Sequence, residues 1–166
     1  MFVPFDALPA DARIWIYQAD RSLTQVEEQA LAYSLQDFCE DWKAHGQALK
    51  TSFKIERHQF VILAVDENYN DASGCSIDGS VRILKLLQEQ SGIDFFNRTR
   101  VAFLLDGSVQ TFALTELKNL FTSSRLTATT PTFNNLVATK SDFDTNWLTT
   151  CEKTWLIKYL PKSAVA

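Results

Sequence analysis

The sequence contains no cluster of basic residues and no uninterrupted apolar segment long enough to cross a bilayer. Its 16 Lys and Arg against 20 Asp and Glu give a formal net charge of -4 and a pI near 5.1. Such an average charge repels nucleic acid and anionic membrane surfaces. The first residues also lack the basic and then apolar pattern of a signal peptide. We therefore expect a cytoplasmic protein with no nucleic-acid partner and no membrane insertion.

Cysteine is sparse and is never paired at short spacing. Cys39, Cys75 and Cys151 are far apart, and no Cys-x-x-Cys motif of a zinc or redox site is present. An odd number of isolated thiols is typical of a reduced compartment. We expect neither a bound metal nor a cofactor.

Linkers, internal repeats and low-complexity tracts are also missing. A chain of 166 residues with 46% hydrophobic and 12% aromatic residues can bury one sizeable core. We predict a single domain over residues 1–161, followed by a frayed tail over residues 162–166.

The first half of the chain begins with a strand followed by a helix. Residues 13–17 are apolar on both faces of a strand, which suits a central position in a sheet. A capping box of Thr24 and Glu27 then starts a helix. We expect Gly46 to end this helix and His45 to pair with its last carbonyl groups.

Further strands and a second helix follow. Residues 51–56 alternate as in an edge strand, whereas residues 60–65 are apolar throughout. The second helix ends near Gly92, and residues 101–105 and 109–113 then flank a type I′ hairpin turn at Asp106-Gly107. The second helix is indicated by apolar residues at helical spacing, namely Ile77, Val81, Leu84 and Leu87.

This order of elements predicts an α+β fold of the ferredoxin-like, split βαβ type. The expected strand order is 5-4-1-3-2, with an added hairpin strand and a helical C-terminal extension. Helices on one face would leave the other apolar face bare, and we expect the C-terminal third to cover it. That third offers a helix near 115–121, a strand at 135–138, a helix capped by Ser141 and an aromatic stretch over 147–159. The alternative is that this face is an oligomer interface or a ligand site.

The most unusual segment is residues 66–80, a polar stretch between a buried strand and a helix. A cysteine at a helix N-terminus can have a lowered pKa, which makes Cys75 a candidate nucleophile with His45 or His58 as its base. The alternative is that Ser73 or Ser76 caps the helix and Cys75 is a small buried side chain.

The same segment suggests an anion site. Gly74 and Gly79 have the G-x-x-x-x-G spacing of a phosphate-binding loop, but Ser80 and Val81 replace the Lys-Ser/Thr pair that nucleotide hydrolysis requires. Backbone amides at the helix start could still bind another anion. Two amides before an apolar segment and a nearby lysine could add contacts. The predicted ligand-binding residues are Ser73, Gly74, Ser76, Asp78, Gly79, Asn134, Asn135 and Lys140.

A calcium site is a weaker alternative for the same loop. Asp66, Asn68 and Asn70 match the first three ligand positions of an EF-hand loop. Asp71 replaces the turn glycine and Ile77 replaces the bidentate glutamate. Asx-turns explain the same residues without a metal.

Four segments are distinctive when taken together, namely Trp15 to Ala19, Phe60 to Asp66, Ser73 to Asp78 and Phe133 to Lys140. In combination they resemble a family of short uncharacterised bacterial proteins whose members are often labelled "ABC transporter ATPase". The resemblance covers nearly the whole chain and implies no catalytic residue. An ABC ATPase requires a Walker A lysine, an acidic Walker B strand end and an LSGGQ-type signature, which this sequence lacks. We therefore do not expect ATPase activity.

Because no complete catalytic set is present, the sequence favours a non-catalytic binding or interaction module. Its partner would be a small anionic ligand at residues 66–80, or a protein. One alternative is a thiol-dependent enzyme using Cys75, and another is a structural protein that acts through a homo-oligomer surface.

Overall fold

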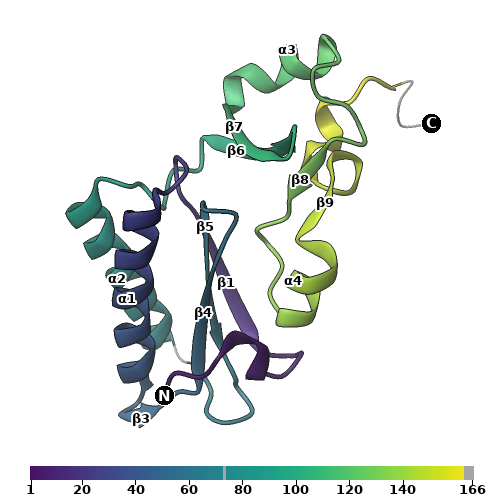
Figure 1. Cartoon of the computed structure of the whole chain (residues 1–166). Coiled ribbons are helices and arrows are strands. Elements are labelled where there is room, and N and C mark those ends of the chain that lie inside the picture. The colour runs from purple at the N-terminus through teal and green to yellow at the C-terminus, as the bar shows by residue number, and fades with distance from the viewer. Residues whose placement is uncertain (73, 163–166) are drawn as a thin grey trace.

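The computed structural model describes residues 1–72 and 74–162. Within these residues the chain forms four α-helices, several 3-10 turns and antiparallel sheets, which fits the predicted α+β class. Figure 1 shows two long helices on one side of a central sheet and the C-terminal part of the chain on the other side. The strands are β1 (Arg13–Gln18), β2 (Lys43–Ala44), β3 (Gln47–Ala48), β4 (Thr51–Glu56), β5 (Phe60–Val65), β6 (Arg100–Leu105), β7 (Ser108–Ala113), β8 (Pro131–Phe133) and β9 (Leu148–Thr150). The helices are α1 (Gln25–Asp41), α2 (Gly74–Ser91), α3 (Leu117–Thr122) and α4 (Lys140–Asn146), and the 3-10 helices are η1 (Phe5–Ala7), η2 (Leu114–Glu116), η3 (Cys151–Lys153) and η4 (Trp155–Tyr159).

The central sheet has the strand order β1-β5-β4, with antiparallel pairing throughout. All six residues of the middle strand β5 are buried. Because side chains alternate across a strand, Val61, Leu63 and Val65 face one core while Phe60, Ile62 and Ala64 face another. The sheet therefore needs a covering layer on each face.

Helices α1 and α2 cover the first face. The predicted capping box is present, since the Glu27 amide donates to Thr24 Oγ1 and the Thr24 amide donates to the Glu27 carboxylate. At the other end of α1, Trp42 Nε1 donates a hydrogen bond of 2.9 Å to the carbonyl of Ser76 in the first turn of α2. This bond ties the end of one helix to the start of the other. The predicted end of α2 is also confirmed, because Gly92 follows it at φ +75°.

The predicted end of the first helix is wrong. Helix α1 ends at Asp41, and His45 and Gly46 form the turn between the short strands β2 and β3. Both residues have positive φ, 51° and 76°, as a type I′ hairpin turn requires. His45 is thus a turn residue, because the chain reverses in a hairpin before it reaches β4.

The C-terminal third and the N-terminal segment cover the second face of the sheet. Trp147 packs against Phe60 and Phe133, with ring centroids 5.0 and 4.8 Å apart. The predicted cover is therefore found, although its elements are shifted. The strand is β8 (Pro131–Phe133) rather than residues 135–138. Residues 134–137 form a turn, in which the Leu136 amide donates to Asn134 Oδ1 and the Val137 amide donates to the Asn134 carbonyl. Helix α4 is capped by Thr139 rather than Ser141.

A second sheet, ordered β7-β6-β8-β9, lies beyond one end of the first (Figure 1). Its first two strands form the predicted hairpin, with Asp106 and Gly107 at φ 52° and 77°. A third core fills the space between this sheet, α3 and the last 3-10 turns. Its buried residues are Phe103, Leu117, Phe121, Leu126, Cys151, Leu156 and Leu160.

The ferredoxin-like strand order 5-4-1-3-2 is not found among the described residues. Two parts of it are present, the β1-β5-β4 neighbours and the β6-β7 hairpin, but β6 pairs with β8 instead of β1. The free edge of β1 is occupied by residues 138–140, since the Ile14 amide donates to Ala138 and the Lys140 amide donates to Ala12. The five strands predicted to form one sheet therefore lie in two, with β1, β4 and β5 in the first and β6 and β7 in the second.

Two glycine substitutions should change stability in opposite directions. Gly79 lies inside α2 without a positive φ, and Gly107 sits at φ +77°; an added Cβ would meet no atom within 4 Å at either site. Gly79→Ala should therefore stabilise the fold by about 0.5–1 kcal/mol, because alanine favours a helix. Gly107→Ala should destabilise it by about 1 kcal/mol, because alanine is strained at that φ. Urea unfolding measures both values, and equal effects of the two variants would contradict this assignment.

Candidate functional site

A cleft lies where the end of β1 meets the start of β6. It consists of two adjoining hollows of about 730 and 230 Å³, of which the larger lies within the size range of small-molecule sites. Both hollows are lined by Gln18 at the end of β1, by Arg98 and Arg100, and by the turn after β8. We call these two hollows together the junction cleft. It is bounded by parts of both sheets and by the loop that leads from α2 to β6.

The junction cleft is positively charged in an acidic protein. Lys85, Arg98 and Arg100 line it, and none of the described lining residues is Asp or Glu. None of the three cations forms an ion pair with another described residue. Lys85 Nζ lies 5.9 Å from the Phe96 ring centroid, and Arg100 donates to the Thr111 carbonyl at 2.8 Å. The cleft therefore offers cationic donors that no carboxylate of the described chain neutralises.

Two side-chain amides in the cleft are held in place by other groups. Gln18 donates from Nε2 to the carbonyl of Arg100 at 3.2 Å and accepts from Asn135 Nδ2 at 3.3 Å. Asn135 Oδ1 in turn accepts from Trp147 Nε1 at 2.9 Å. Each amide nitrogen carries a second hydrogen, which remains for a ligand. This chain of bonds links the second core to the cleft and fixes the direction of both amides.

Part of the remaining wall of the cleft is apolar. Ile16, Val81 and Phe96 contribute half-buried surface, and Leu136 is 85% exposed at the rim. Tyr17 contacts Phe96 edge to face at a centroid distance of 5.8 Å. Burial raises the pKa of Tyr17, with an opposing contribution from its hydrogen bond to Ser80, so its phenol stays neutral near pH 7. The cleft combines an apolar wall with cationic and amide donors.

Segment 66–80 begins at the opposite end of β1, since Asp66 follows Val65, which pairs with Arg13. It then runs back through the first turns of α2 to Ser80, whose Oγ lies 3.4 Å from the Tyr17 hydroxyl. Gly74 is the first residue of α2, Asp78 is exposed, and Ser76 is buried beneath the end of α1. Ser73 and the side chain of Cys75 lie outside the described residues. The candidate anion site on the α2 amides thus stays a prediction.

The structure does not bring all the predicted ligand residues together. Asn134 and Asn135 line the junction cleft. Lys140 is near the start of β1, on the face away from α2, and its Nζ lies 5.9 Å from the Phe5 ring centroid. The predicted residues therefore belong to three separate places.

The polar side chains of the 66–70 loop bond to the protein itself. Asp66 Oδ1 accepts from the Asn68 amide in an Asx-turn, Asn68 Nδ2 donates to Asp11, and Asn70 Nδ2 donates to Ala48. No group of three or more His, Cys, Asp or Glu suited to a metal occurs among the described residues. The turn interpretation accounts for these residues.

The two candidate histidines lie far from each other. His58 sits in the β4–β5 turn, and its Nδ1 lies 2.9 Å from the Glu28 carboxylate. His45 is exposed in the β2–β3 turn, and the carbonyl of Ala48 in the following strand accepts from Asn70 of the loop before α2. The first turn of α2 therefore lies at the same end of the sheet as His45. His58 lies at the opposite end.

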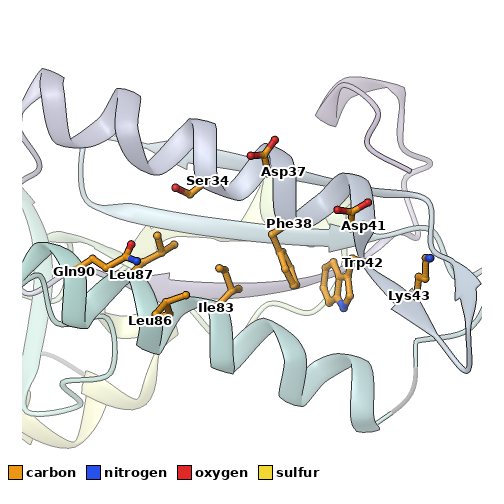
Figure 2. A pocket seen from close by; sticks show the side chains of 10 residues that line it. All are labelled: Ser34, Asp37, Phe38, Asp41, Trp42, Lys43, Ile83, Leu86, Leu87 and Gln90. Carbon is orange, nitrogen blue, oxygen red and sulfur yellow. The ribbon is translucent and has the colours of Figure 1, made fainter.

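A second concave surface lies between α1 and α2. Figure 2 shows Phe38 extending from α1 into the space above α2, with Ile83 on the facing helix. Two adjoining hollows of about 470 and 270 Å³ follow the helix pair. We call them the helix groove.

No protein-family model, curated protein or solved structure matches this chain. Among the helices of the described residues, none combines the length and apolar character needed to cross a membrane. The function must therefore be inferred from the sites themselves.

Sequence reasoning missed the cations of the junction cleft. Arg98 and Arg100 are only two residues apart and directly precede a predicted strand, but they do not form a run of basic residues. Lys85 lies on a different element and joins them only in three dimensions. The sequence feature that could have indicated these cations is Arg98-Thr99-Arg100 at the start of β6.

Alkylation should leave the two buried thiols, Cys39 and Cys151, unmodified. Cys39 and Cys151 are fully buried, and burial raises the pKa of each to about 12. Because the thiolate is the reactive form, iodoacetamide at pH 8 should modify neither residue in the folded protein. Mass spectrometry of the Cys75→Ala variant checks this, with the urea-unfolded variant as the positive control. Rapid labelling of Cys39 or Cys151 without denaturant would contradict the described packing.

Proposed function

We propose that this chain is a binding protein for a small amphipathic anion, held in the junction cleft. The carboxylate or phosphate of the ligand would be bound by Arg98, Arg100 and Lys85, and its apolar part would lie against the wall formed with Phe96 and Leu136. The observation that carries the proposal is a cleft with three cations and, among its described lining residues, no Asp or Glu, in a chain of net charge -4.

The charge arrangement supports an anionic ligand. Cations without a carboxylate partner repel one another. An anion bound between them removes this repulsion, which makes its binding free energy more favourable. Arginine adds paired N–H donors that match a carboxylate or phosphate. Arg100 is already oriented by its bonds to Thr111, which reduces the entropy lost on binding.

The apolar wall supports a ligand with a hydrophobic part rather than a free inorganic ion. An exposed Leu136 and a half-buried Phe96 would lose contact with water only if such a part covered them. The amides of Gln18 and Asn135 could fix the orientation of the ligand's polar atoms. The proposal keeps the small anionic ligand expected from the sequence but moves it from residues 66–80 to this cleft.

The thiol-enzyme alternative and the family resemblance both stay predictions. A reactive Cys75 would alkylate faster than a thiol in an unfolded chain, and its rate would follow a lowered pKa. The binding proposal depends on neither of them, because it rests on Arg98, Arg100 and Lys85.

Ligand binding should stabilise the folded protein and depend on the cleft cations. Octanoate, phenyl phosphate, acetate and inorganic phosphate can be compared by thermal shift and calorimetry. A ligand present at a hundred times its Kd adds about 2.7 kcal/mol of stability, which corresponds to a rise in Tm of roughly 5–10 °C. We expect such a rise with an amphipathic anion, and a smaller one with acetate or inorganic phosphate.

Matched variants decide whether the effect arises in the cleft. Lys85→Ala with Arg98→Ala removes two exposed cleft cations and should weaken binding at least about tenfold. Lys118→Ala with Arg125→Ala removes two exposed cations outside the cleft and should leave the affinity unchanged. The proposal fails if no anion raises Tm, or if both double variants lose binding equally.

A further inference from the structure

The helix groove is a second site, separate from the junction cleft, and its floor is apolar. Its floor includes Phe38, Trp42, Ile83 and Leu87, and Leu86 is 47% exposed beside them. At the other end of the groove, Val26 is 76% exposed. The two hollows share Ser34, Leu87 and Gln90, so they form one continuous surface along both helices.

The rim of the groove is acidic. Helix α1 contains five Asp or Glu residues and no Lys or Arg. Asp37 and Asp41 line the groove, and neither forms an ion pair with a described residue. The carbonyl groups at the end of α1 add a partial negative charge at the same place. Lys43 is the single cation among the described residues that line the two hollows.

This charge selects among the molecules that could cover the apolar floor. A second copy that paired groove to groove would bring its own acidic α1 against the first, and like charges would repel. An anionic membrane surface or a nucleic acid would be repelled in the same way. A partner with basic residues on both sides of an apolar stripe would match both the floor and the rim.

We propose that the helix groove binds an amphipathic helical segment of another protein, with Lys or Arg residues flanking its apolar face. An apolar helix face in a groove between two helices is an established mode of peptide recognition. The apolar side chains of the segment would contact Phe38, Ile83 and Leu86. Its cations would pair with Asp37 and Asp41 at the rim.

A peptide probe tests the charge complementarity directly. Two labelled 18-residue helical peptides carry the same leucine face, one with lysines on its flanks and the other with glutamates. Fluorescence anisotropy with the full chain should show binding of the lysine peptide at least about tenfold tighter than that of the glutamate peptide, because only its charges complement the rim. Equal binding, or no binding of either peptide, would overturn the proposal.

Two variants of the groove and a matched control locate the binding site. Asp37→Lys with Asp41→Lys, and separately Leu86→Asp, should each weaken binding of the lysine peptide about tenfold. Glu89→Lys with Asp144→Lys makes the same charge change outside the groove, and should alter the affinity less than about threefold. Circular dichroism confirms that each variant is folded. An equal loss of affinity in the control variant would overturn the proposal and indicate non-specific attraction between charges. A dimer that is seen by light scattering and that Leu86→Asp dissociates would also overturn it and indicate self-association.

Discussion

The middle strand β5 is apolar at each of its six positions, so both faces of the first sheet must be shielded from water. Helices α1 and α2 shield one face, and the C-terminal third shields the other through Trp147, Phe133 and Phe143. Burying a large side chain of this kind is worth about 1.5–3 kcal/mol relative to leaving it exposed. The positions of the other elements depend on this requirement.

Covering the second face also determines where the junction cleft forms. The segment that follows β8 runs along the edge of β1 to reach α4, since Asn135 bonds to Gln18 and residues 138–140 bond to residues 12–14. Strand β6 is thereby separated from β1 and pairs with β8. The cleft is the space left between the two sheets, and the link from Trp147 through Asn135 to Gln18 connects it to the second core.

The helix layer has a different consequence. Helices α1 and α2 direct their buried residues toward the sheet, and Trp42, the residue after α1, bonds to Ser76 of α2. The space between their outer surfaces is the helix groove, which keeps apolar residues exposed beside unpaired carboxylates. The two proposed sites therefore have opposite charge, and they would bind different classes of partner.

The sequence by itself determined the local structure. The capping box, the two-sided strand β5 and the Asp106-Gly107 turn all depend on neighbouring residues, and each was predicted from spacing alone. Local signals failed where two interpretations competed, as at Gly46, which suits a helix end as well as a hairpin turn.

Only the tertiary structure decided how the strands divide between the two larger sheets and which side chains meet. Strand order depends on which segment forms hydrogen bonds with the edge of β1. Residues 138–140 form these bonds, and β6 does not. The cleft cations Lys85 and Arg98 are on different elements, so the spacing of residues in the sequence does not predict that they lie close together. Backbone preferences act over a few neighbouring residues, whereas these contacts join residues that are far apart in the chain.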